Sequence, residues 1–294
     1  MKIALLGPGL MGAQIACEYA LGGHEVVILA RRVDMAEERL ARSWATALEH
    51  GLATTDEISQ AQGRLQLTTD MERTSGSEII VESVVEDLDQ KAEAVKPLLT
   101  LSPAAIVASN TSSIPITAIG EAVGAPEQTV GAHYWNPPLL MPLVEIIRGD
   151  RTSDSTVKTM ETTVRGLGKR PVRIDRDVAG FVWNRLQLAL LREAVWIVEQ
   201  GVASPAVVDE IVRDGLARRW RFTGPFQTAA LGGASTFERI AGNLWPVLSQ
   251  AGSVDNLRQW LDETPETTLP LRERRDTGLA ADLRADRAVE GRGG

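Results

Sequence analysis

The chain has 294 residues, of which 44% are hydrophobic and 24% are charged, a composition typical of a packed globular protein with one large or two ordinary domains. Its 39 acidic and 31 basic residues give a formal charge of −8, which argues against nucleic acid as a general partner. The single cysteine, Cys17, excludes an intrachain disulfide and a cysteine-rich metal site, and we expect no bound metal.

The first apolar run is too short for a secretory signal or a membrane span. Residues 3–6 are followed at once by a glycine-rich loop. No later stretch reaches the roughly 20 apolar residues that a bilayer requires. We therefore expect a cytoplasmic protein without a membrane partner.

Short apolar runs alternate with helical patterns through the first 180 residues. Helices are expected around residues 12–21, 34–50 and 88–99. Strands are expected at residues 2–6, 25–29, 78–82, 105–109, 129–133, 143–147 and 171–174. This alternation predicts an α/β fold with a Rossmann-type, doubly wound parallel sheet.

After about residue 180 the pattern becomes helical throughout. Apolar residues recur at helical spacing in 182–200, and Ser204 before Pro205 marks a further helix start. No strand is expected after residue 174, and three more helices are expected at residues 237–251, 254–261 and 270–285. The sequence thus predicts two domains, residues 1–180 and 181–294, of which the second is all helical.

A glycine-rich loop joins the first predicted strand to the first predicted helix. Its pattern G-x-G-x-x-G opens that helix, where free backbone N–H groups can hold a pyrophosphate. The loop consists of Gly7, Pro8, Gly9, Leu10, Met11 and Gly12. Because a second strand follows at the right distance, the loop predicts that residues 1–180 bind a dinucleotide.

The end of the second predicted strand selects between the two nicotinamide cofactors. An NAD site has an acidic residue there, about 20 residues beyond the loop, but this chain has Ala30 followed by Arg31 and Arg32. Guanidinium groups bind a 2′-phosphate, whereas a carboxylate repels it. The sequence therefore favours NADP. The alternative is NAD, with Asp34 in the acidic role.

One of the three histidines lies where ligands bind in an open α/β sheet. His24 is expected in a surface turn, and His50 at a helix end before Gly51. His133 ends an apolar strand, and Glu145 follows within the next one. Because a buried carboxylate needs a partner, we predict His133 as a general base that Glu145 orients.

Three further polar segments fit either a site or an ordinary structural role. Residues 109–113, at the end of the fourth predicted strand, carry hydroxyls that suit a substrate or a helix cap. Asn184, where the helical domain begins, suits a substrate or an interhelical hydrogen bond. The third segment suits a carboxylate, CoA phosphates or a solvated helix end and contains Arg218, Arg219 and Arg221.

Together these motifs resemble the 3-hydroxyacyl-CoA dehydrogenase family. The shared segments follow the family's order over most of residues 1–230 and comprise residues 7–12, 81–86, 109–113, 133–137, 143–145 and 180–185. The resemblance implies a catalytic pair of His133 and Glu145, and a homodimer formed through the helical domain. It implies further site residues: Ser112 and Asn184 at the substrate oxygen, Asn136 in support, and Glu86, Lys91 and Asn110 around the nicotinamide ribose.

The resemblance implies an oxidoreductase that transfers hydride to or from C3 of a small molecule. One candidate substrate is a 3-hydroxyacyl thioester on CoA or a carrier protein. The other is a free polar 3-hydroxy acid, such as L-gulonate or a carnitine-like compound, because residues 136–138, 142–145 and 199–205 are similar to the branch with L-gulonate 3-dehydrogenase and lambda-crystallin. A non-catalytic, crystallin-like protein is a third alternative, against which the intact His133–Glu145 pair argues.

Overall fold

The computed structural model describes residues 1–253, 257 and 269–290. The chain divides into two compact units. The first comprises Met1–Val182 and the described part of Arg272–Gly294, and the second comprises Trp183–Leu271. A segment near the end of the chain therefore packs with the first unit, whereas the division into functional domains at residues 180 and 181 stays a prediction.

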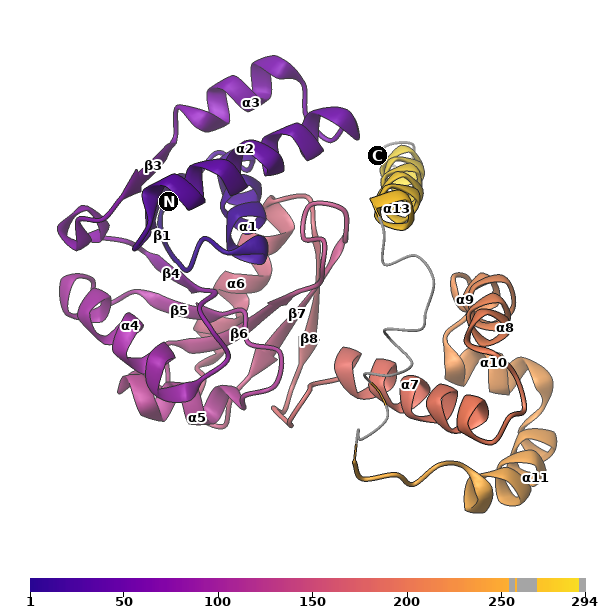
Figure 1. The fold of residues 1–294 in the computed structure, drawn as a ribbon. Helices are drawn as coiled ribbons and strands as arrows, with labels where there is room; N and C mark the ends of the chain where they lie inside the picture. The colour runs from indigo at the N-terminus through magenta and orange to yellow at the C-terminus, as the bar shows by residue number, and fades with distance from the viewer. Residues whose placement is uncertain (254–256, 258–268, 291–294) are drawn as a thin grey trace. The chain divides into compact units, whose positions relative to one another are not determined.

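The first unit is built on an eight-stranded sheet in the order β3-β2-β1-β4-β5-β6-β7-β8 (Figure 1). The strands are Lys2–Leu6 (β1), Glu25–Leu29 (β2), Leu65–Thr68 (β3), Ile79–Glu82 (β4), Ile106–Ser109 (β5), Thr129–Tyr134 (β6), Leu143–Arg148 (β7) and Arg170–Ile174 (β8). Neighbouring strands are parallel except β6 and β7. The expected doubly wound sheet is confirmed, but the expectation of parallel pairing is wrong for this one pair. Residues 135–142 are too few for the crossover that a parallel connection requires.

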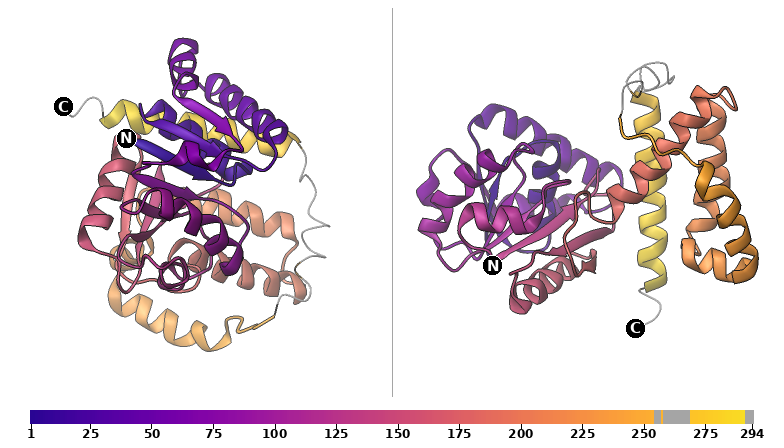
Figure 2. Two further views of the ribbon diagram at one scale, coloured as in Figure 1. Left: turned by 90° about the vertical axis from the view of Figure 1, so that its left-hand side faces the viewer. Right: turned by 90° about the horizontal axis from the view of Figure 1, so that it is seen from below.

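Helices cover both faces of this sheet (Figures 1 and 2). One buried apolar cluster packs the sheet against α1 (Leu10–Leu21), α2 (Val33–Glu49), α3 (Thr55–Gln62) and α6 (Asp154–Gly166). A second cluster, on the other face, contains residues of α4 (Leu88–Leu101) and α5 (Ile116–Val123). The central strands are buried on both faces, which explains their continuous apolar runs.

The strand β3 and the helices α3, α5 and α6 were not predicted from the sequence. The strand β3 lies at the edge of the sheet and is only half-buried, so it lacks a continuous apolar run. The helix α3 is short, but it begins with a capping box in which Thr54 and Glu57 satisfy each other's backbone N–H groups. That box is a local signal that could have revealed the helix.

The second unit contains only helices among its described residues. They are α7 (Trp183–Glu199), α8 (Pro205–Glu210), the π-helical turn Ile211–Leu216, α9 (Ala217–Trp220), α10 (Pro225–Gly232), α11 (Ala234–Leu244) and a short 3-10 turn at Trp245–Val247. As expected, the Ser204 hydroxyl caps α8 by accepting a hydrogen bond from the Val207 N–H.

The helix α13 (Leu269–Glu290) confirms the one predicted over residues 270–285. The helix predicted at 254–261 lies outside the described residues, apart from residue 257. Within the described part of the chain, no helix is both long and apolar enough to cross a bilayer.

Candidate active site

The glycine loop follows β1, which lies between β2 and β4 in the sheet. This is the point at which the order of the strands along the sheet reverses direction. Gly7 has a φ of +80°, and a Cβ there would lie 2.4 Å from the Ser83 carbonyl oxygen. A Cβ on Gly12 would lie 2.2 Å from the Gly7 carbonyl oxygen, whereas a Cβ on Gly9 would meet no atom nearer than 4.0 Å. Packing therefore requires the first and third glycines, and the second faces open space. This open approach to the first turn of α1, formed by Leu10 and Met11, fits a pyrophosphate.

The expected choice between NADP and NAD depends on the residues that follow β2. Ala30 is buried, and Arg31 and Arg32 are exposed. The Arg32 guanidinium lies 3.1 Å from the Asp34 carboxylate, so this acidic residue already has a cation beside it. A third guanidinium, that of Arg39 in α2, donates to the Pro8 carbonyl oxygen of the glycine loop at 3.1 Å and was not predicted.

His133 and Glu145 lie directly opposite each other on the antiparallel strands β6 and β7. His133 Nδ1 and Glu145 Oε2 are 2.8 Å apart, and both side chains are buried. The Val182 N–H donates to Glu145 Oε1 at 3.3 Å, and the Phe181 ring lies 5.6 Å from the imidazole, measured between centroids. The strand register explains the pair, because opposite residues on antiparallel strands have Cβ atoms about 4.5–5.5 Å apart.

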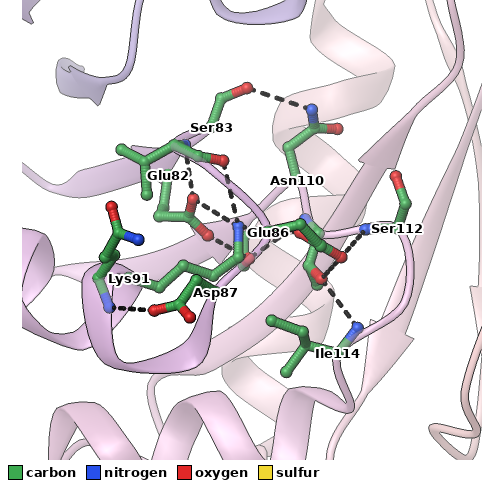
Figure 3. A network of polar contacts seen from close by, with 12 residues as sticks. Glu82, Ser83, Glu86, Asp87, Lys91, Asn110, Ser112 and Ile114 are labelled. Carbon is green, nitrogen blue, oxygen red and sulfur yellow. Dashed lines mark hydrogen bonds and ion pairs between the residues drawn. The ribbon is translucent and has the colours of Figure 1, made fainter.

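Three charged side chains meet where β4 ends and α4 begins (Figure 3). Lys91 Nζ lies 2.8 Å from Glu82 Oε1 and 3.2 Å from Glu86 Oε2. The Lys91 and Glu82 side chains are only 1% and 0% exposed. Glu82 also accepts a hydrogen bond from the Ser109 hydroxyl at 2.5 Å. Glu82 was not predicted as a site residue, although a carboxylate in an apolar strand needs a partner.

Glu86 holds the turn that follows β5. Its Oε1 accepts from the Thr111 hydroxyl at 2.6 Å, from the Ser112 N–H at 2.9 Å, and from the N–H and hydroxyl of Ser113 at 2.8 and 2.9 Å. Burial raises the pKa of Glu86, but the Thr111 and Ser113 hydrogen bonds and the Lys91 charge outweigh burial and lower this pKa to about 2. The carboxylate therefore stays ionised and fixes the turn. The Ser112 side chain points away from the Glu86 carboxylate (Figure 3).

Asn110 links the ends of three strands. Its Oδ1 accepts a hydrogen bond from the Tyr134 N–H at 2.9 Å, and its Nδ2 donates to the Ser83 hydroxyl at 3.3 Å. Its own N–H donates to the Glu82 carbonyl oxygen at 2.8 Å. Polar groups that follow β4, β5 and β6 thus gather at the carboxyl edge of the sheet, the edge from which the glycine loop also emerges.

Other predicted site residues belong to other elements of the chain. Asn136 is exposed in the loop between β6 and β7. Asn184 lies in the first turn of α7, in the second unit. The second unit also holds Arg218, Arg219 and Arg221, in α9 and directly after it. The roles of these residues stay predictions.

The other two histidines lie just after the ends of helices α1 and α2, away from the His133–Glu145 pair in the sequence. The expected turn before β2 is present at Gly22 and Gly23, but the His24 ring is half-buried and lies edge-on to Tyr19 at 5.8 Å. His50 follows α2 and precedes Gly51, whose φ of +63° suits a glycine at a helix end. Among residues 1–253, 257 and 269–290, no group of three or more His, Cys, Asp or Glu side chains is placed to hold a metal ion.

Comparison with known proteins decides the family. The NAD-binding domain of 3-hydroxyacyl-CoA dehydrogenase matches residues 2–178, and the C-terminal domain of the same enzyme matches residues 180–267. The chain belongs to the 3-hydroxyacyl-CoA dehydrogenase family. It is accordingly an oxidoreductase that depends on a nicotinamide cofactor, as the glycine loop at the sheet's turning point indicates.

Relatives in this family carry different substrate names. A probable 3-hydroxybutyryl-CoA dehydrogenase of Deinococcus radiodurans is 39% identical over 220 residues, which cover 74% of this chain and 78% of the relative. The 5-formyl-3-hydroxy-2-methylpyridine 4-carboxylate 5-dehydrogenase of Mesorhizobium japonicum is 36% identical over 260 residues, which cover 86% and 82%. A solved structure of a dehydrogenase with this substrate name, described as an NAD+-dependent dismutase, aligns with a TM-score of 0.85 and 32% identity over 97% of both chains.

Proposed function

We propose that this protein interconverts a hydroxyl and a carbonyl group at C3 of a 3-hydroxyacyl thioester, with His133 as the general acid and base. The 2.8 Å contact between His133 and Glu145 carries the proposal. Glu145 fixes the imidazole through Nδ1, which leaves Nε2 as the atom that exchanges a proton with the substrate. A bound nicotinamide supplies or accepts the hydride.

The remaining site residues act on the substrate oxygen and on its surroundings. In the reducing direction, Ser112 and Asn184 hold the carbonyl oxygen while negative charge grows on it, and His133 delivers the proton. In the oxidising direction, His133 removes the hydroxyl proton, and the Glu145 carboxylate stabilises the resulting imidazolium. Asn136 supports this arrangement from the loop after β6.

The cofactor is held by the loop and by the strand ends. The backbone of Gly7, Gly9 and Gly12 and the first turn of α1 receive the pyrophosphate. Glu86 and Asn110 line the nicotinamide ribose region. Because the Lys91 side chain is only 1% exposed, it acts there through Glu86, whose carboxylate lies 3.2 Å from its ammonium.

NADP is the proposed cofactor, with Arg31 and Arg32 at its 2′-phosphate. Ala30 offers no carboxylate to repel that phosphate, and the nearby Asp34 already pairs with Arg32. Charge-assisted hydrogen bonds of about 1.5–3 kcal/mol would favour NADP by about tenfold or more. The alternative, NAD, is supported by the description of the matching domain and by the NAD+-dependent solved relative. The ratio of kcat/KM for NADPH to that for NADH at fixed ionic strength decides, and a ratio at or below one would reject NADP.

A free carboxylic acid is the second candidate substrate. The solved relative that aligns over 97% of both chains is described as acting on a pyridine carboxylic acid, not on a thioester. Arg218, Arg219 and Arg221 are exposed in the second unit and suit either a free carboxylate or the phosphates of CoA. Rates with a 3-oxoacyl thioester and with the matching free 3-oxo acid, followed by cofactor absorbance, distinguish the two.

The same assay tests the proposed chemistry. His133→Gln should lower turnover by about 10²–10⁴-fold, the usual contribution of a general acid or base, and should leave cofactor affinity nearly unchanged. A folded His133→Gln variant with near-normal turnover would refute the role of His133. If the wild-type protein binds the cofactor but reduces neither the 3-oxoacyl thioester nor the free 3-oxo acid, the crystallin-like alternative is favoured.

A cytoplasmic homodimer formed through the second unit completes the proposal. Large apolar side chains of that unit are highly exposed in the single chain, among them Phe222 at 81%, Phe226 at 90% and Trp245 at 71%. Apolar side chains at this exposure are typical of an interaction surface, and most soluble homodimers have two-fold symmetry. Light scattering that finds only a 31.8 kDa species at micromolar concentration would reject the dimer.

A further inference from the structure

A second buried pair of a lysine and a carboxylate joins Lys169 to α1, and the same lysine contacts the loop between the strands that carry His133 and Glu145. Lys169 directly precedes β8, and its Nζ lies 2.8 Å from Oε1 of Glu18 in α1. The two side chains are 2% and 8% exposed. Neither group has a part in the chemistry proposed above, so this pair requires its own explanation.

The Lys169 ammonium also binds the backbone of that loop, residues 135–142. It donates to the carbonyl oxygens of Pro138 at 2.7 Å, Met141 at 3.0 Å and Leu139 at 3.4 Å. One cation therefore gathers three carbonyl groups that no strand pairing satisfies. Buried backbone carbonyls require such partners, and the three N–H donors of the ammonium are shared among these carbonyls and the Glu18 carboxylate.

The loop also makes contacts that do not involve Lys169. Three of its residues are prolines, which have no N–H to donate. The N–H groups of Leu140 and Met141 both donate to the Pro137 carbonyl oxygen at 3.1 Å, and the Leu139 N–H donates to Oε1 of Gln14 at 3.3 Å. The Pro142 carbonyl accepts a hydrogen bond from the Arg170 N–H of β8 at 2.7 Å, and Leu139 packs in the buried apolar cluster. Towards α1 the loop is joined through Gln14 directly and through Lys169 to Glu18.

Stability alone does not explain a buried ion pair at this place. Replacing such a pair by apolar residues of similar volume is often neutral or stabilising, because both charges must be desolvated. The carbonyl contacts, in contrast, need the ammonium itself. The arrangement therefore indicates that the position of the loop is what the pair maintains, and that Glu18 supplies the counter-charge.

We propose that Lys169 is a positioning residue that holds residues 138–141 and thereby keeps His133 and Glu145 in register at the two ends of their connection. Because α1 also carries the glycine loop at its N-terminus, the same helix positions both the glycine loop and the loop of residues 135–142. This inference rests on the proposed function for its catalytic consequence, but the structural part stands on the contacts alone.

Three variants separate positioning from simple stabilisation. Lys169→Met leaves Glu18 buried without the cation that contacts it, so the melting temperature should fall. The double variant Glu18→Gln with Lys169→Met removes both charges, so the melting temperature should recover at least in part. Its kcat should stay reduced tenfold or more, and its KM for the cofactor should change less than twofold. Glu18→Gln alone keeps the ammonium on the carbonyls and should keep kcat within threefold. Lys158→Met, on the exposed side of α6, is the matched control.

Amide hydrogen exchange provides a readout that does not depend on activity. In the folded double variant, the amides of Leu139, Leu140 and Met141 should exchange at least tenfold faster than in the wild type, while amides of α4 keep their rates. Unchanged exchange in the loop, or wild-type kcat in the double variant, would overturn the proposal. Normal turnover of His133→Gln would instead overturn the proposed function, and the exchange rates would still decide the role of Lys169.

Discussion

The Lys91 ammonium and the Glu82 carboxylate form an ion pair of 2.8 Å that water hardly reaches. The same carboxylate accepts a hydrogen bond from the Val84 N–H at 2.7 Å, which closes the turn after β4. The carbonyl of Ser83, in the middle of this turn, is the group against which Gly7 packs. The ion pair therefore shapes the surface on which the glycine loop lies.

Removing the cation from this pair should cost much stability. Lys91→Met leaves Glu82 buried and uncompensated, and we expect the free energy of unfolding to fall by about 3–5 kcal/mol. Urea denaturation measures the change, and Lys96→Met, on the exposed side of the same helix, is the control. A loss under about 1 kcal/mol would mean that Glu82 does not depend on Lys91 for its charge.

Glu86 should make stability depend on pH in the acid range. Its pKa is lowered from the ordinary 4.5 to about 2 in the folded protein. A carboxyl group with a lowered pKa stabilises the fold above its unfolded pKa, and this contribution is lost as the pH falls from about 4.5 towards 2. Glu86→Gln should therefore flatten the decline of the unfolding free energy across this window. Glu93→Gln, at an exposed position of α4, should keep the wild-type slope. Equal slopes for Glu86→Gln and wild type would contradict the role of Glu86.

The sequence predicts best those parts of the fold whose signals are local. Residues 2–6 and 25–29 are strands with the predicted bounds, because each is a short apolar run bounded by turn residues. The half-buried edge strand at residues 65–68 has no such run and was missed. Likewise, the antiparallel pairing of β6 and β7 follows from the length of their connection, a constraint that the alternation of strands and helices does not reveal.

The same distinction applies to the site. The glycine loop and His133 stand in short motifs whose chemistry can be read locally, and Glu145 is a carboxylate within an apolar run. The partners of Lys91 and Lys169 depend on which elements pack together, and so Glu82 and Glu18 were not predicted. A buried carboxylate in an apolar stretch was a usable signal in the case of Glu82, because it requires a cation from another element.

Glu145 should contribute to turnover through its charge as well as its position. Glu145→Gln keeps an oxygen that can accept from the Val182 N–H, but it loses the negative charge beside the imidazole. We expect kcat to fall by about 10²–10⁴-fold, since the imidazolium that forms during oxidation is no longer stabilised. Steady-state rates measure this, with circular dichroism as the check on folding. Retention of more than a third of wild-type kcat would leave Glu145 with a structural role only.

The glycine loop offers a test of cofactor binding in which two similar substitutions should act differently. A Cβ on Gly12 would lie 2.2 Å from the Gly7 carbonyl oxygen, so Gly12→Ala should destabilise the protein by about 1–3 kcal/mol through overpacking. A Cβ on Gly9 meets no atom nearer than 4.0 Å, and the φ of −75° there is accessible to alanine. Gly9→Ala should therefore keep the wild-type melting temperature and weaken cofactor binding at least tenfold, because the methyl group occupies the space that the pyrophosphate approaches.

Thermal unfolding and calorimetric titration with the cofactor measure the two effects separately. Gly63→Ala, where a Cβ makes only an ordinary contact of 3.4 Å at the end of α3, controls for the glycine-to-alanine change itself. If Gly9→Ala binds the cofactor as tightly as the wild type, the pyrophosphate does not lie against this glycine.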